Sequence, residues 1–151
     1  MASAAFTSAG TKISLSSEAP GSYDDTGFSG LSFNEIGEVT DLGEFGREYS
    51  LVTHNPLGSR QTVKRKGSFN DGTISMTVAR VPGDAGQTDL QTAVDSDDNY
   101  SFKVELQDGR VLYFAAQVMS YTTNVGSVDQ ITSASVSIEI TDEIIEVAPT
   151  P

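Results

Sequence analysis

The chain has 151 residues, the size of a single domain, and a formal net charge of −12 at pH 7. A surface of that sign repels nucleic-acid phosphates and anionic lipid head groups, so the composition argues against tight binding to either. The absence of cysteine excludes disulfides, thiolate metal sites and a cysteine nucleophile. No apolar run approaches the roughly 20 residues that a membrane-spanning helix needs.

The N-terminal part of the chain predicts short strands between polar loops. Residues 1–10 are small and polar and indicate a flexible arm. Residues 11–17 alternate polar and apolar side chains, which predicts a strand. Residues 31–40 form an extended segment whose alternation slips between Phe33 and Ile36, as at a bulge or bend.

A further strand is predicted over residues 47–54, and the Asn-Pro-Leu-Gly sequence after it ends that strand because proline donates no hydrogen bond to a sheet. We expect residues 55–70 to form a long loop. Residues 73–81 give the clearest strand of the chain. In it Ile74, Met76 and Val78 face one side, and Thr73, Ser75 and Thr77 face the other.

One α-helix is predicted, over about residues 84–96. Asp84 can cap it, and Gln87 stands three residues later as in a capping box. Leu90, Ala93 and Val94 then make an apolar stripe with helical spacing.

The C-terminal part predicts a hairpin and one long strand. Residues 100–106 and 111–121 flank an Asp-Gly pair, which is a strong signal for a tight turn. Residues 131–141 alternate strictly, and residues 142–151 indicate a tail. In the long strand Ala134, Val136, Ile138 and Ile140 face inward, and Ser133, Ser135, Ser137 and Glu139 face outward.

These elements predict a mainly β fold, namely a two-sheet β-sandwich or barrel with one flanking helix. We expect a single domain over residues 11–141, an N-terminal arm over residues 1–10 and a C-terminal arm over residues 142–151.

Catalytic and metal-binding patterns are missing from the sequence. The single histidine, His54, stands at a predicted strand end without a nucleophile or an orienting acid nearby in the chain. Residues 95–99 imitate the start of a calcium loop, but Tyr100 and Leu106 occupy positions that require Gly and Glu. We therefore expect no catalytic residues, no metal and no cofactor.

Positive charge is concentrated in one segment. Residues 59–67 hold four of the nine basic residues and no acid, whereas the rest of the chain is acidic. The segment is either an ordinary solvated loop or a loop that docks on the acidic surface of another copy. Its basic residues are Arg60, Lys64, Arg65 and Lys66.

Three stretches in this order resemble the tail tube (major tail) proteins of long, non-contractile-tailed bacteriophages. They are Glu-Val-Thr-Asp-Leu-Gly at 38–43, Tyr-Ser-Leu-Val-Thr-His-Asn-Pro-Leu-Gly at 49–58 and Thr-Val-Lys-Arg-Lys-Gly-Ser-Phe-Asn-Asp-Gly-Thr at 62–73. The predicted single helix between β segments and the chain length agree with the family. The resemblance runs from about residue 11 to residue 147.

The resemblance implies a β-sandwich or barrel of which six copies form a ring, with neighbouring sheets joined around a central channel. Rings stack through the N-terminal arm, the C-terminal arm and the long loop, to which it assigns Arg60, Lys64, Arg65 and Lys66. It also implies assembly in the host bacterial cytoplasm, a place in the virion tail, and tail tip or baseplate, tape-measure and tail terminator proteins as partners.

A conduit for viral DNA must not bind it, so its wall should lack cations. Two predicted strand faces fit this role, and they could equally be ordinary solvent-facing sides of a sandwich. Their residues are Thr73, Ser75 and Thr77 on one strand and Ser133, Ser135, Ser137 and Glu139 on the other.

Two other classes of function compete with this hypothesis. A tube protein of a contractile tail or of a type VI secretion-like system is hard to separate from it by sequence. A monomeric β-sandwich binding module would favour exposed aromatic side chains, but most Phe and Tyr residues fall at inward strand positions.

Overall fold

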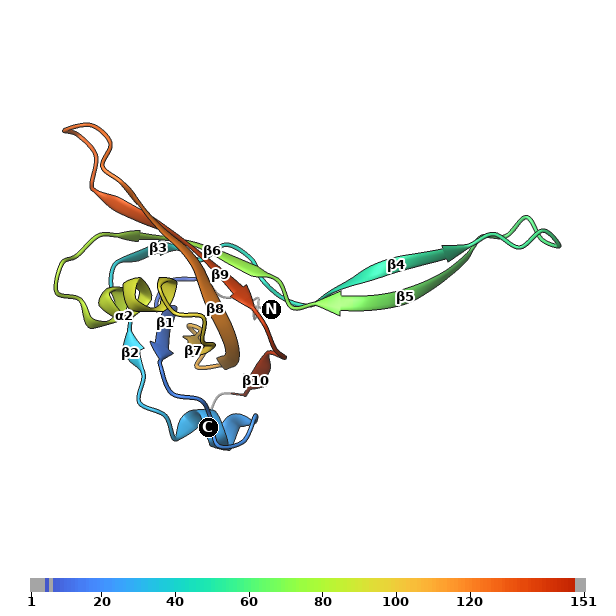
Figure 1. The fold of residues 1–151 in the computed structure, drawn as a ribbon, viewed down its shortest axis with the longest axis horizontal. Helices are drawn as coiled ribbons and strands as arrows, with labels where there is room; N and C mark the ends of the chain where they lie inside the picture. The colour runs from blue at the N-terminus through green and yellow to red at the C-terminus, as the bar shows by residue number, and fades with distance from the viewer. Residues whose placement is uncertain (1–4, 6, 149–151) are drawn as a thin grey trace.

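The computed structural model describes residue 5 and residues 7–148, which fold mainly into β-strands with two helices (Figure 1). The expected mainly β fold with a flanking helix is confirmed. The strands are β1 (Lys12–Ser16), β2 (Asn34–Glu35), β3 (Val39–Asp41), β4 (Glu48–His54), β5 (Val63–Asn70), β6 (Thr73–Ala79), β7 (Tyr100–Glu105), β8 (Val111–Asn124), β9 (Ser133–Ile140) and β10 (Ile145–Val147), and the helices are α1 (Asp25–Ser29) and α2 (Ala85–Val94).

One antiparallel sheet carries eight of the strands and curls around the hydrophobic core. Its order is β2-β1-β7-β8-β9-β6-β3, and β10 pairs with the start of β8. The expected sandwich or barrel is thus one continuous curved sheet. Strands β4 and β5 form a separate two-stranded hairpin that projects away from the body (Figure 1).

The core follows from alternation along the long strands. Ile74, Met76 and Val78 of β6 and Val136 and Ile138 of β9 are buried on the concave side of the sheet. At its centre the rings of Phe102 and Phe114 stack with centroids 5.5 Å apart. Burial of such side chains is the main stabilising contribution to the fold.

Helix α2 is anchored by one buried amide. Asp84 caps the helix by accepting a hydrogen bond from the Gln87 amide nitrogen at 3.0 Å, as expected. The Gln87 side chain does not return to Asp84 as a capping box requires. It donates to the carbonyl oxygens of Gly37 and Ala79 at 3.0 and 2.9 Å and accepts from the Val81 amide at 3.0 Å.

The expected long loop over residues 55–70 is wrong for its second half. Residues 63–70 form β5, which pairs with β4 in a register that sets Leu51 opposite Lys66 and Val52 opposite Arg65. Only residues 55–62 connect the two strands. The sequence did not predict this strand because its polar residues form no apolar face. Pairing with β4 holds it in place instead.

Three smaller differences also concern local structure. Residues 31–40 split into β2 and β3 around Glu38, which has a positive φ of 58°. Helix α1 was not expected, and β10 lies inside the segment expected as the C-terminal arm. Half of the expected N-terminal arm, residues 1–4 and 6, and the end of the C-terminal arm, residues 149–151, lie outside the described residues. Neither described helix has the length and apolarity to cross a membrane.

We predict that Gln87→Ala destabilises the subunit by about 2–4 kcal/mol, because it removes a buried side chain and leaves two partly buried carbonyl groups and one amide without their partner. Urea unfolding followed by circular dichroism measures this change. Gln91→Ala, one turn further along α2 on the exposed side, should change the unfolding free energy little. Equal stability of the two variants would contradict the anchoring role of Gln87.

Candidate functional site

The two predicted polar strand faces lie side by side and form one surface. In the register of β6 and β9, Thr73 stands opposite Glu139, Ser75 opposite Ser137 and Thr77 opposite Ser135. Ser133 stands opposite Ala79 at the end of the pair. Because apolar neighbours in both strands point into the core, the hydroxyl groups face the outside of the sheet.

This polar face carries almost no charge. Strands β6, β8 and β9 contain no Lys or Arg, and their single carboxylate is Glu139. The Thr73 hydroxyl donates to a Glu139 carboxylate oxygen at 2.8 Å, which fixes that side chain against the sheet. The surface therefore offers hydroxyl groups and one negative charge per subunit, and no group that binds phosphate strongly.

Strand β8 extends this polar face beyond what the sequence predicted. Ser120 pairs with Ser137, Thr122 with Ser135 and Asn124 with Ser133. The register shifts between Val118 and Ser120, where Met119 forms an irregularity. This bulge breaks the period of two, so the alternation rule could not place the second half of β8 on the same side.

Two hairpins leave the polar face at opposite ends. The β4–β5 hairpin joins β6 at Thr73, which pairs with Glu139 near the end of β9. The β8–β9 turn lies beyond Ser133, which pairs with Ala79 at the other end of β6. Figure 1 shows the two hairpins projecting on different sides of the body.

The four predicted cations all lie on the β4–β5 hairpin. Arg60 is in the connecting turn, and Lys64, Arg65 and Lys66 follow one another along β5. All four are exposed, and the Lys66 ammonium lies 4.8 Å from the ring centroid of Tyr49. Consecutive strand residues alternate sides, so both faces of the ribbon are positively charged.

The same hairpin exposes apolar side chains that the charge pattern did not predict. Leu51 is 66% exposed and Leu57 at the tip is fully exposed, and Tyr49, Val52 and Phe69 are also on the surface. An isolated two-stranded hairpin is at best marginally stable in water. The ribbon is therefore a candidate binding surface with both apolar and ionic contacts to offer.

Arg47 connects the base of the hairpin to the body. Its Nε lies 3.5 Å from a carboxylate oxygen of Asp71, and its Nη2 lies 3.8 Å from one of Glu143. Its guanidinium also sits 4.0 Å from the ring centroid of Phe69. A hydrogen bond with Tyr49, followed by charge attraction, raises the pKa of Arg47 above its usual value. The side chain thus contacts both hairpin strands and the body.

The backbone at this junction relies on glycine. Gly46 and Gly72 have φ values of 147° and 103°, which side-chain-bearing residues rarely adopt. A Cβ atom on Gly72 would lie 3.1 Å from the Gly46 carbonyl oxygen. The two chain segments that enter and leave the hairpin therefore lie close together. The Arg47 side chain joins them to the body through its ion pairs.

Tyr23 holds the Glu143 segment that Arg47 contacts. Its hydroxyl donates to the Glu143 carbonyl oxygen and accepts from the Ala115 amide at 3.1 Å. Burial, the largest cause, raises the pKa of Tyr23 to about 12. The hydroxyl therefore stays protonated, and able to donate, to a higher pH than an ordinary tyrosine does.

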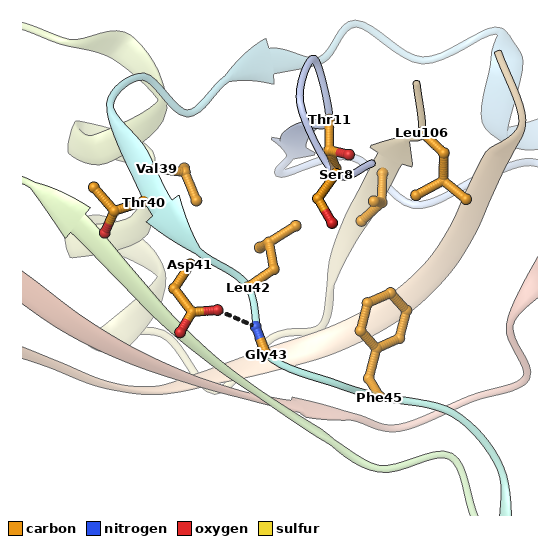
Figure 2. A pocket seen from close by; sticks show the side chains of 10 residues that line it. Ser8, Thr11, Val39, Thr40, Asp41, Leu42, Gly43, Phe45 and Leu106 are labelled. Atoms are coloured by element: carbon orange, nitrogen blue, oxygen red, sulfur yellow. Dashed lines mark hydrogen bonds between the residues drawn. The ribbon is translucent and has the colours of Figure 1, made fainter. Parts of the chain in front are cut away.

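A cavity of about 260 Å³ lies where residues 39–45 approach the end of β7 (Figure 2). Leu42, Phe45 and Leu106 give it apolar walls, and Asp41 is the only acid among the described residues that line it. The Asp41 carboxylate accepts a hydrogen bond from the Gly43 amide at 2.8 Å. Among the described lining residues there is no acid–base pair or activated nucleophile. Nor do the described residues bring three metal-ligating side chains together anywhere in the chain.

Comparison with known proteins identifies one family. The sequence model of the lambda phage tail tube protein matches residues 21–144 of the chain. No curated protein sequence matches it.

Solved structures share the fold over nearly the whole chain. A chain of the anti-feeding prophage baseplate gives a TM-score of 0.70 at 8% identity, covering 97% of both chains. A chain from the tail of an empty gene transfer agent particle, with C6 symmetry, gives 0.69 at 17% identity, covering 95% of this chain and 100% of that one. The SPP1 tail tube gives a TM-score of 0.61 at 15% identity, covering 90% of this chain and 75% of that one.

We predict that Arg47→Ala loosens the orientation of the β4–β5 hairpin without unfolding the body. Because the chain has no cysteine, spin labels can be placed at Thr53→Cys on the hairpin and Thr92→Cys on α2. Electron–electron distance measurements should give a narrow distribution for the parent and a broad one for Arg47→Ala.

Arg110→Ala is the matched control for this measurement. Arg110 is 38% exposed, against 36% for Arg47, and also contacts two carboxylates, each at 3.7 Å, but lies away from the hairpin. It should leave the distance distribution unchanged. A distribution that stays narrow in Arg47→Ala would show that Arg47 does not position the hairpin.

Proposed function

Because the chain belongs to the lambda phage tail tube protein family, we propose that it forms hexameric rings that stack into the hollow tail tube of a bacteriophage with a long, non-contractile tail. It is a structural protein and not an enzyme. The observation that supports the proposal best is the cation-free polar face with a projecting hairpin at each end.

Ring formation is supported by open strand edges. Strand β7 pairs with β8 only up to Ala116, whereas β9 pairs with it from Ala116 to Asn124. Within the described part of the chain, no strand pairs with the other edge of residues 117–124. On the far side of the polar face, β3 pairs with β6 only at Thr77 and Val78. Open edges of this kind favour pairing with another chain, and a ring closes them.

The polar face supports a role as the channel wall. In a ring closed through these edges, β6, β9 and β8 of each subunit contribute their hydroxyl-rich side to one continuous barrel. Such a wall presents Glu139 and no lysine or arginine. Viral DNA then passes without tight binding, because no cation replaces its counterions.

Stacking of rings is assigned to the β4–β5 hairpin and to both chain ends. The hairpin carries four cations on a chain whose net charge is −12, so the acidic body of a neighbouring copy is its natural partner. The arms over residues 1–10 and 142–151 add contacts between rings. Further partners in this proposal are tail tip or baseplate, tape-measure and terminator proteins in a virion tail assembled in the host cytoplasm.

A tube inside a contractile injection system is the second candidate. The fold matches a sheath/tube terminator chain of an extracellular contractile injection system, with a TM-score of 0.68, at least as well as it matches the SPP1 tail tube. Electron microscopy of the native particle decides between the two, because only a contractile system surrounds its tube with a sheath.

We predict that the purified protein forms rings and tubes in negative-stain micrographs as its concentration rises. Replacing Lys64, Arg65 and Lys66 together by Glu should leave a folded subunit that no longer elongates. Each exposed ion pair contributes only about 0–1 kcal/mol, but the contacts repeat around every ring. Added salt should weaken elongation of the parent, since exposed charges are screened beyond about 8–10 Å.

Replacing the same three residues by Gln provides the graded control, because it removes the attraction without adding repulsion. Its tubes should be shorter than those of the parent. Normal tube length in the Glu variant would rule out the ionic contact, and a monomeric parent at all concentrations would rule out the proposed function.

We predict that the triple change Ser75→Lys, Ser135→Lys and Glu139→Lys permits tube assembly but slows DNA ejection. The effect should be strongest at low salt, because each lysine adds a phosphate contact. The measurement is the ejection rate from tails carrying these changes. The double change Ser75→Lys and Ser135→Lys tests the same effect while keeping the Thr73–Glu139 hydrogen bond.

Lysines at Gln91 and Thr92, which are exposed on α2, serve as the control with equal added charge to the double change. They should not alter the ejection rate. Ejection at the parent rate from tails with the Ser75, Ser135 and Glu139 changes at low salt would show that these side chains do not line the channel or that its charge has no effect.

A further inference from the structure

The β8–β9 turn, residues 125–132, exposes a group of branched aliphatic side chains. Val125 is 64% exposed, Ile131 is 79% exposed and Val128 is 98% exposed. The turn contains one charged residue, Asp129. Exposed apolar side chains at a projecting tip contribute no burial free energy in an isolated subunit. Their clustering therefore indicates a contact surface.

The turn is already shaped before any contact forms. The Gln130 amide donates to the Ser127 carbonyl oxygen at 3.0 Å, and the Ser127 amide donates to the Gln130 side-chain oxygen at 3.2 Å. Gly126 has a φ of 67°, and a Cβ atom there would collide with the Gln130 side chain. This closure holds Val128 in solvent, and a preorganised tip loses less entropy on binding.

The position of the turn identifies its partner. The polar face continues along β8 and β9 to their last pair, Asn124 and Ser133, which lie directly before and directly after the turn. In a barrel the strands run from one rim to the other. If this face lines the channel, the turn stands at the rim of the ring, where the adjacent ring begins.

We infer that Val125, Val128 and Ile131 form an apolar contact with a second copy of this chain in the next ring. This inference rests on the proposed function. DNA is not the partner, because the turn has no cation with which to bind phosphate. The contact differs from that of the β4–β5 hairpin, which leaves the opposite end of the polar face and carries the positive charge.

The test compares Val128→Asp with Val128→Leu. Both side chains lie in solvent in the subunit, so both variants should unfold at the parent temperature. Val128→Asp should form rings but raise the critical concentration for tube elongation about tenfold or more, the factor expected when burial of a valine side chain is lost. Val128→Leu keeps an apolar contact and should elongate like the parent.

A second variant tests the preformed turn. Gln130→Ala removes the side-chain closure of Ser127 but leaves the three aliphatic side chains in place. It should raise the critical concentration less than Val128→Asp does. Sedimentation measures the polymer fraction, and negative-stain microscopy separates rings from tubes.

Each remaining outcome overturns the inference. An unchanged critical concentration in Val128→Asp would show that the turn is not an inter-ring contact. Monomers in place of rings would assign the turn to ring closure instead. A parent protein that forms no tubes would overturn the proposed function, and this inference with it.

Discussion

The antiparallel register that joins β6 to β9 and β9 to β8 is the constraint on which both the core and the candidate channel face depend. It sets Ile74 opposite Ile138 on the concave side and Ser75 opposite Ser137 on the convex side. A slip by one residue would turn every side chain to the opposite face. The apolar side therefore fixes the polar side: hydrophobic burial within one subunit determines which hydroxyl groups reach the outer surface.

The β4–β5 hairpin shows the opposite situation, because no element among the described residues covers it. Its strands bond only to each other, and its apolar side chains are exposed. Arg47 and the glycine pair Gly46 and Gly72 orient it at the base, but they cannot replace a core. In the proposed tube a neighbouring copy supplies the missing burial, so the hairpin gains its full stability only on assembly.

Strict alternation explains why some elements could be predicted from the sequence and others could not. Strands β6 and β9 keep a period of two along their length, so both faces were predictable residue by residue. Helix α2 and the β7–β8 turn also carry local signals, a capping Asp84 and an Asp-Gly pair. These signals depend only on the nearest residues in the chain.

Elements that depend on distant residues could not be predicted in this way. Strand β5 exists because β4 pairs with it, and its Lys-Arg-Lys run has no apolar face. The irregularity at Met119 shifts the second half of β8 by one position, which only the pairing with β9 shows. The buried role of Gln87 was hidden because its partners, Gly37 and Ala79, come from other parts of the chain.

The unlike ends of the polar face determine what kind of assembly this subunit can build. One end carries a ribbon with four cations, and the other carries an aliphatic turn with a single acid. A cationic end does not complement another cationic end, and an aliphatic end with a single acid offers no opposite charge to pair with its own copy. Stacked rings of the proposed tube would therefore all point in the same direction. A head-to-tail contact of this type does not close on itself and continues as an open filament. The length of such a tube is then not encoded in the subunit. Another component has to start and stop its growth, in agreement with the tail tip, tape-measure and terminator proteins proposed as its partners.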